Sequence, residues 1–144
     1  MTYCTEETGE GKASNSGLQN GDFHGATPPS SFKECVLLLC GFRRRVEIDG
    51  ISMEPTLSEG DVLLFNPAAY RAKAPTIGDL LLIKHPYEKG RHMVKRLTQI
   101  IKKREETRYH VEGDNPDHST DSRSFGTLIN TRILGQITSR YSQR

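Results

Sequence analysis

Apolar and polar residues alternate after residue 45 with the period of half-buried β-strands. Val46 and Ile48 alternate with Glu47 and Asp49, which predicts a strand with one buried face. Short apolar or alternating runs between turn residues predict further strands at residues 62–65, 80–83, 93–101, 109–111 and 133–137. Several short strands separated by Gly and Pro predict an all-β domain, either a barrel or a pair of packed sheets.

The segment before the first strand follows a different period. Its apolar residues recur at about the spacing of one helical face: Phe32, Cys35, Leu39 and Phe42. Ser31 is a suitable N-cap, so a short helix is predicted over residues 32–42. A buried first strand is the alternative interpretation. In either case we expect the apolar face to pack on the β core or on a partner.

The first 31 residues of this 144-residue chain differ in composition from the rest. They hold seven apolar side chains and no Val or Ile, and they end shortly after Pro28-Pro29. Such a segment buries too little apolar surface to offset the entropy lost on ordering. We therefore predict a disordered polar tail at residues 1–31 and one folded domain at residues 32–144.

Charge and hydropathy exclude two classes of protein. The 20 Lys and Arg nearly balance the 18 Asp and Glu, for a formal net charge of +2. A protein that holds nucleic acid by its phosphates usually carries a larger, clustered excess. The mixed-charge run at residues 102–106 is interpreted as a solvated hairpin tip. The longest apolar run, Cys35 to Phe42, is far shorter than the roughly 20 residues of a membrane-spanning helix.

Cysteine and histidine usage predicts neither disulfides nor a metal site. The three cysteines form no CxxC pair, and the five histidines show no metal-ligand spacing. The N-terminus is polar and acidic, unlike a secretory signal. We expect reduced thiols, a cytoplasmic location and no cofactor.

Three polar segments interrupt the strand pattern where a sheet does not require them. The first is Ser-Met-Glu-Pro-Thr-Leu, starting at Ser52, and the second is Lys95-Arg96, inside a strand-like run. The third, from Gly113 to Gly126, reads Gly-Asp-Asn-Pro-Asp-His-Ser-Thr-Asp-Ser-Arg-Ser-Phe-Gly. Taken singly, they are consistent with a turn hydroxyl, a solvent-facing lysine and a loop of Asx turns.

Together and in this order, the segments resemble the signal peptidase I family of serine proteases. A Gly-Asp pair followed by an apolar strand is a further match, and the resemblance covers about residues 46–137. It implies a signal-peptidase-like β catalytic core with Ser52 as nucleophile and Lys95 as general base. A serine hydroxyl needs such a base because it is a weak nucleophile by itself, and Ser–Lys pairs are a recognised variant of the serine protease triad.

A lysine can serve as a base only where its surroundings favour the neutral amine. Its ordinary pKa is about 10.4, and burial can lower a lysine pKa by up to ~3–5 units. We expect apolar neighbours to shield Lys95 from water and Arg96 to lie on the opposite face of the strand. The expected neighbours are Met93, Val94, Leu97 and Ile100.

The resemblance also assigns the third segment. It implies that Ser119 orients the lysine amine and that Asp121 and Arg123 form an ion pair that shapes the site, with Asp114 supporting the same loop.

The surroundings of the nucleophile follow the family in part. The resemblance implies that Met53 lines the substrate cleft and that the Ser52 backbone N–H contributes to the oxyanion hole, a donor typically worth ~3 kcal/mol. Many family members carry a serine two residues before the nucleophile, whose hydroxyl completes the oxyanion hole. Here that position is Gly50, so another donor must take this role.

The absence of a spanning segment points to one branch of the family, the short, soluble proteases that mature nickel-type superoxide dismutase. The resemblance implies removal of a short N-terminal propeptide from the dismutase precursor, whose freed N-terminus then becomes a nickel ligand.

Two other functions remain open. One is a peripheral membrane signal peptidase that docks through residues 32–45, with the arginines at the lipid headgroups. The other is the self-cleaving core of an SOS-type repressor, for which Cys40-Gly41 is a candidate cleavage site; the polar tail, however, is a poor match to a DNA-binding domain.

Overall fold

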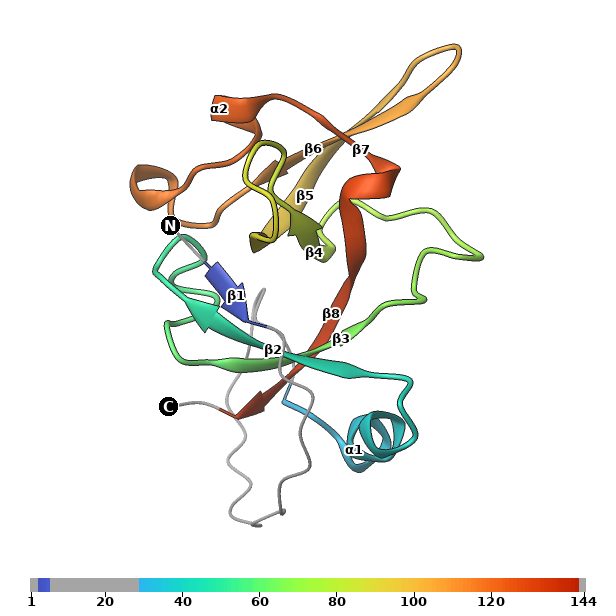
Figure 1. Cartoon of the computed structure of the whole chain (residues 1–144), viewed down its shortest axis with the longest axis vertical. Coiled ribbons are helices and arrows are strands. Elements are labelled where there is room, and N and C mark those ends of the chain that lie inside the picture. The colour runs from blue at the N-terminus through green and yellow to red at the C-terminus, as the bar shows by residue number, and fades with distance from the viewer. Residues whose placement is uncertain (1–2, 6–28, 143–144) are drawn as a thin grey trace.

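The structure is a computed structural model that describes residues 3–5 and 29–142 (Figure 1). Its elements in chain order are β1 (Tyr3–Thr5), α1 (Phe32–Leu39), β2 (Arg44–Asp49), β3 (Val62–Asn66), β4 (Leu80–Lys84), β5 (His92–Lys102), β6 (Thr107–Glu112), η1 (Pro116–His118), α2 (Ser122–Phe125), β7 (Leu128–Ile129), η2 (Asn130–Arg132) and β8 (Ile133–Ser142).

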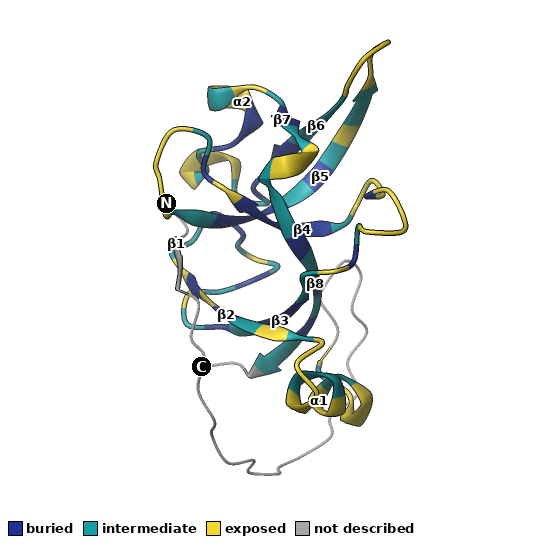
Figure 2. Ribbon diagram, turned by 45° about the vertical axis from the view of Figure 1, so that its right-hand side comes forward, coloured by how far each residue is buried: buried dark blue, intermediate teal, exposed yellow. Residues whose placement is uncertain are grey.

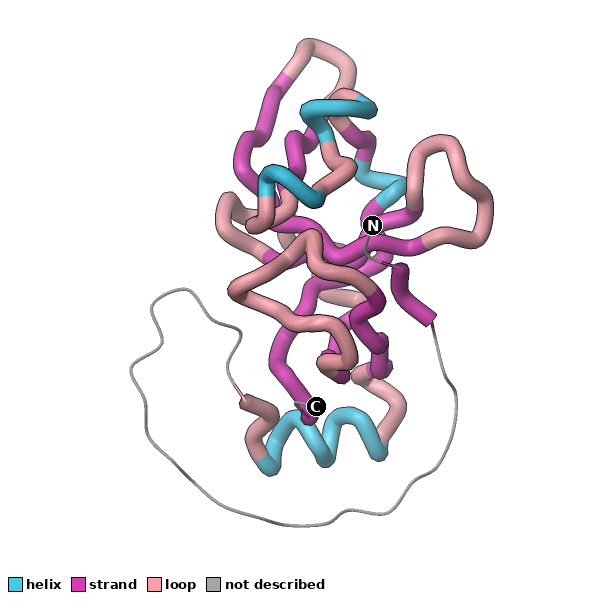
Figure 3. The backbone as a smooth tube through the Cα atoms, turned by 90° about the vertical axis from the view of Figure 1, so that its left-hand side faces the viewer, coloured by secondary structure: helices cyan, strands magenta, loops and turns pink. Residues whose placement is uncertain are grey.

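The strands form one eight-stranded sheet in the order β1-β2-β3-β8-β4-β5-β6-β7, and every neighbouring pair is antiparallel. The all-β prediction is confirmed. The sheet curves strongly, since β1 at one edge also contacts β5 near the other end of the strand order. The predicted hairpin tip at residues 102–106 is exposed between β5 and β6 and lies at the opposite end of the molecule from α1 (Figure 3).

Apolar side chains are packed on both faces of the sheet. Four consecutive residues of β4 are buried, because successive side chains of a strand point to opposite faces and both faces are covered here. Leu80 and Leu82 belong to one core cluster, whereas Leu81 and Ile83 belong to the other. The fully apolar run that predicted this strand therefore reflects its central position.

Strand β8 joins the two halves of the sheet. It pairs with β3 on one side and with β4 on the other. It therefore lies between the pair β2–β3, which flanks the Ser52 loop, and the pair β4–β5, in which β5 carries Lys95. Its pairing with β3 changes register twice, and its pairing with β4 changes once.

Helix α1 forms where predicted but ends at Leu39, and none of its residues is buried. The Phe32 and Leu39 side chains are 85% and 90% exposed, and α1 lies on the outside of the sheet (Figure 2). Glu34 instead faces the sheet, where it accepts hydrogen bonds from Thr138 Oγ1 and Arg43 Nε, each at 2.8 Å. The apolar face therefore does not pack on the β core, and the other expectation, that it packs on a partner, stays a prediction.

Most of the predicted disordered tail, at residues 1–2 and 6–28, lies outside the described residues. Within the tail, Tyr3–Thr5 are described as β1, paired with β2. A strand of three residues is too short to produce an alternating pattern, so no sequence signal marked it. Towards the other end of the tail, the Ser30 N–H donates to the Arg140 carbonyl at 2.7 Å.

Candidate active site

Ser52 lies on the loop between β2 and β3. The loop begins at Gly50, whose φ of +98° is a conformation that side-chain-bearing residues rarely adopt. Beyond Ser52, the Leu57 N–H donates to the Met53 carbonyl at 2.9 Å, and both side chains are fully buried in the core. The buried side chains of Met53 and Leu57 thus fix the part of the loop that follows Ser52 and hold the Ser52 backbone in place.

Lys95 lies in β5, opposite Leu81 of β4. Its Nζ is 2.7 Å from Ser52 Oγ and 3.0 Å from Ser119 Oγ. Ser52 is 0% and Lys95 1% exposed, and the neighbours Met93, Val94 and Leu97 are buried. Burial disfavours the charged form of an amine, which is the direction that a lysine base requires.

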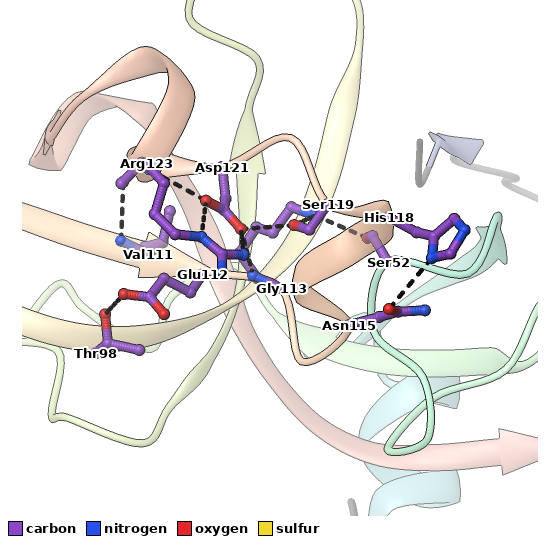
Figure 4. Close-up of polar contacts among 12 residues, drawn as sticks. Ser52, Thr98, Val111, Glu112, Gly113, Asn115, His118, Ser119, Asp121 and Arg123 are labelled. Carbon is purple, nitrogen blue, oxygen red and sulfur yellow. Dashed lines mark hydrogen bonds and ion pairs between the residues drawn. The ribbon is translucent and has the colours of Figure 1, made fainter.

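The Asp121 carboxylate organises the loop that carries Ser119 (Figure 4). It accepts hydrogen bonds from Ser119 Oγ at 2.6 Å, from the Gly113 N–H at 2.9 Å, and from both the side chain and the N–H of Arg123. Burial alone would raise the pKa of Asp121, but the hydrogen bonds from Arg123, Gly113 and Ser119 outweigh it and hold that pKa well below its ordinary value. Asp121 is therefore an ionised, acceptor-only group at neutral pH.

This carboxylate fixes the direction of the neighbouring hydrogen bonds. Because ionised Asp121 has no proton to give, the Ser119 hydroxyl donates to it, and Ser119 Oγ accepts from Lys95 Nζ. A neutral lysine amine has two hydrogens and one lone pair. With one hydrogen directed to Ser119, a neutral Lys95 amine would keep its lone pair for the Ser52 hydroxyl, whose oxygen lies 2.7 Å from Nζ.

A second acidic group, Asp114, links the loop to β5 and to the Ser52 loop. Arg96 donates to both of its oxygens, at 2.8 and 2.7 Å, and Thr56 Oγ1 donates to Oδ2 as well. Burial would raise the pKa of Asp114, yet the hydrogen bonds from Arg96 and Thr56 bring it below its usual value. A bidentate arginine–carboxylate pair of this kind holds the carboxylate in a fixed geometry.

Gly113 and Asn115 bring the two loops into direct contact. The Asn115 N–H donates to the Ser52 carbonyl at 3.0 Å, and its side-chain amide donates to the Ile51 carbonyl at 3.1 Å. A Cβ atom at Gly113 would lie 2.2 Å from Ser119 Oγ and 2.5 Å from the Ser52 carbonyl oxygen. Glycine is therefore required here by the close approach of the loops.

The structure brings most of the predicted site residues together: Ser52, Lys95, Ser119, Asp121, Arg123 and Asp114. Met53 is different, because it is 0% exposed and packs in the core. Its place in a substrate cleft therefore stays a prediction. The positive φ of Gly50 gives a physical reason for the missing serine at that position, since a β-carbon would strain the turn.

Sequence reasoning missed the groups that support the Ser52 loop from β8 and the neighbouring loops. Arg140 of β8 donates to the Thr56 carbonyl, and its Nε lies 3.4 Å from the fully buried Asp61 carboxylate. Asp61 also accepts from the Ser58 N–H at 3.0 Å. The Gly-Asp pair at residues 60–61 was visible as a motif, but nothing in the sequence paired it with a residue in the last strand.

Comparisons with known proteins identify the family of this chain. Residues 35–100 match the family described as signal peptidase, peptidase S26. The chain is also 32% identical over 117 residues to mitochondrial inner membrane protease subunit 1 of Xenopus tropicalis, a match that covers 68% of this chain and 70% of the relative. The chain belongs to the signal peptidase family, peptidase S26. It is therefore a serine peptidase, and protein chains are its substrates.

Across residues 3–5 and 29–142, no helix is long and apolar enough to cross a membrane. Within the same ranges, no group of three or more His, Cys, Asp or Glu side chains is arranged to hold a metal ion.

Proposed function

We propose that this S26 peptidase cleaves peptide bonds with a Ser52–Lys95 dyad. The observation that carries the proposal is the 2.7 Å approach of Ser52 Oγ to Lys95 Nζ in a site where both groups are buried. In the first step Oγ bonds to the substrate carbonyl carbon while Nζ takes the hydroxyl proton. The tetrahedral intermediate then expels the amine, which receives the proton from Nζ.

The second half of the reaction uses the same groups in reverse. Water gives a proton to Lys95 and bonds to the acyl carbon, and the Ser52 oxygen leaves with the proton returned by Nζ. We assign Ser119 and Asp121 to orient the amine. The Ser52 N–H is the proposed backbone donor to the oxyanion, since Gly50 has no hydroxyl to contribute.

The proposed substrate is the precursor of nickel-type superoxide dismutase, from which the enzyme removes a short N-terminal propeptide. The support for this substrate is the resemblance of the Ser52 and Gly113–Gly126 segments to the branch that matures this dismutase. A cytoplasmic location, expected from the free thiols, is part of the same proposal.

The test is incubation of the full chain with purified dismutase precursor, followed by N-terminal sequencing and mass spectrometry of the product. We expect the wild-type enzyme to cut the precursor at one position and the Ser52→Ala variant to leave it uncut. Mature dismutase should not be cut by either enzyme. If a general signal-peptide substrate is cut but the precursor is not, the dismutase proposal is wrong and the dyad stands. Cleavage by Ser52→Ala at the wild-type rate would contradict the dyad.

Membrane docking is a second candidate function, favoured by the surface of α1. Its outward face carries Phe32, Val36 and Leu39, which are 85%, 40% and 90% exposed, and Phe42 follows at 64%. Arg43, Arg44 and Arg45 come next in the sequence, and anionic headgroups attract such residues. The relative named above is an inner membrane protease subunit by its own description.

Vesicle sedimentation tests this candidate. We expect the full chain to sediment with vesicles that contain phosphatidylglycerol, and the pair Phe32→Ser with Leu39→Ser to bind at least about tenfold more weakly, because two large apolar side chains no longer enter the bilayer. Ile77→Ser, at a residue that is 60% exposed outside α1, is the matched control. No sedimentation of the full chain would remove the candidate.

The self-cleaving repressor is disfavoured by the positions of the groups it needs. Cys40-Gly41 lies before the first residue of β2, whereas Ser52 follows its last residue. A six-residue strand is about 20 Å long. The candidate cleavage site and the nucleophile thus lie at opposite ends of β2.

A further inference from the structure

The reactive pair is covered in this structure. Ser52 is 0% and Lys95 1% exposed, whereas a substrate carbonyl must come within roughly 3–3.5 Å of the attacking oxygen. An extended substrate can therefore reach Ser52 only after a covering segment has moved.

Strand β1 lies beside β2, which leads into the Ser52 loop, and beside β5, which carries Lys95. Tyr3, Cys4 and Thr5 pair with Asp49, Ile48 and Glu47, the last three residues of β2, which end three positions before Ser52. β1 also contacts β5, the strand of Lys95. In Figure 1, β1 lies next to β2 and on the side of β2 that faces β4 and β5.

The hydrogen-bonding groups of β2 show which edge β1 takes. The Ile48 N–H donates to the Asp61 carbonyl, and the Ile48 carbonyl accepts from the Gly60 N–H, so both backbone groups of Ile48 face the β3 side. Because these groups alternate along a strand, those of Glu47 and Asp49 face β1. Their register partners, Thr5 and Tyr3, are the residues that complete the ladder at this edge.

The first residues of β5, 92–95, also lie at an edge of the sheet. The β5–β6 pairing begins at Arg96, so among the described strands residues 92–95 are paired only with β4. Two sheet edges thus converge on Ser52 and Lys95, and free sheet edges bind extended peptides by adding a strand. An extended chain between β2 and β5 is a fitting occupant.

We propose that the chain's own N-terminal strand, β1, is autoinhibitory: it occupies the edge formed by Glu47–Asp49, facing β5, and must leave before an extended substrate segment can lie there. The proposal rests on the peptidase function proposed above. β1 is a poor substrate itself, because its described residues lie beside Glu47–Asp49 and not beside Ser52. It is also easy to displace, since a three-residue edge strand forms few hydrogen bonds.

Proline substitutions in the full chain test the proposal. Tyr3→Pro with Thr5→Pro removes the two N–H groups that face β2. We expect the KM for a peptide substrate to fall about 5–20-fold with kcat unchanged, as expected from the loss of a few competing hydrogen bonds. A synthetic peptide with the sequence of residues 1–8 should restore the higher KM competitively, and a scrambled peptide should not. Ala13→Pro with Leu18→Pro is the control outside β1.

Hydrogen exchange separates this proposal from the peptidase function. In the Tyr3→Pro, Thr5→Pro protein we expect faster exchange of the Glu47 and Asp49 amides, while the Ile48 amide, bonded to Asp61, stays protected. Unchanged exchange at Glu47 and Asp49, or an unchanged KM in an active enzyme, would overturn the proposal. If no variant cleaves any substrate but the exchange pattern changes as expected, the peptidase function fails and the β1 contact stands.

Discussion

Lys95→Met is expected to lower kcat by about 10²–10⁴-fold, the usual contribution of a general base. Methionine has a similar length and no amine, so it fills the buried space between Ser52 and Ser119 without a group that can accept the hydroxyl proton. Stability should change little, because an apolar side chain of similar shape suits a buried position. Kinetics with a peptide substrate and a thermal melt measure the two effects.

Two further variants sharpen this result. Lys95→Arg should be as inactive as Lys95→Met, because a guanidinium does not deprotonate. Lys84→Met is the matched control, since Lys84 is exposed at the end of β4 and should keep full activity. A Lys95→Met enzyme with more than about a tenth of the wild-type kcat would exclude Lys95 as the base.

The pH profile adds a separate signature to the same prediction. Between about pH 5 and 9, log kcat should rise with a slope of one and then level off as the base loses its proton. The low pKa of Asp121 keeps its carboxylate ionised throughout this range, so it adds no second limb. A flat profile would contradict a lysine base.

Gly113→Ala is the second large effect we expect. The new methyl group would lie 2.2 Å from Ser119 Oγ, 2.6 Å from Ser119 Cβ and 2.5 Å from the Ser52 carbonyl oxygen, so rotation of the Ser119 hydroxyl alone cannot relieve the clash. The loops must separate, and a displacement of about 1 Å at a reacting group can lower kcat by about 10²-fold. Overpacking should also lower stability by about 1–3 kcal/mol.

Gly135→Ala distinguishes a displaced site from a merely destabilised protein. A Cβ at Gly135 in β8 would lie 2.5 Å from the Asn66 carbonyl oxygen, a comparable clash within the sheet. We expect Gly135→Ala to lower the melting temperature but to keep kcat for the folded protein. Equal kcat losses in the two variants, measured well below both melting temperatures, would show that the Gly113 effect is not local.

The strands that could be predicted are those whose hydrophobic pattern reflects which of their faces are buried. β4 is a continuous apolar run because both of its faces are covered, and β2 alternates because one face is not. β1 and β7, of three and two residues, are too short to carry a period. The outward apolar face of α1 was equally unpredictable, because a helical period shows which residues share a face but not what that face contacts.

The candidate site was predictable in its residues but not in its connections. Ser52 and Lys95 are 43 positions apart, and no local pattern shows that they meet; their proximity came from the resemblance of ordered motifs. The contact of Arg140 with the Ser52 loop links residues 84 positions apart and involves no motif. The packing of Met53 was not predictable either, since this residue next to Ser52 in sequence belongs to the core cluster.

The position of β8 in the sheet has a consequence for biosynthesis. A ribosome releases the polypeptide N-terminal end first, so the strands around Ser52 and the strand of Lys95 are made before the strand that joins them. Until residues 133–142 leave the exit tunnel, the two halves of the sheet lack their shared partner. We therefore expect Ser52 and Lys95 to come together only after β8 has been made.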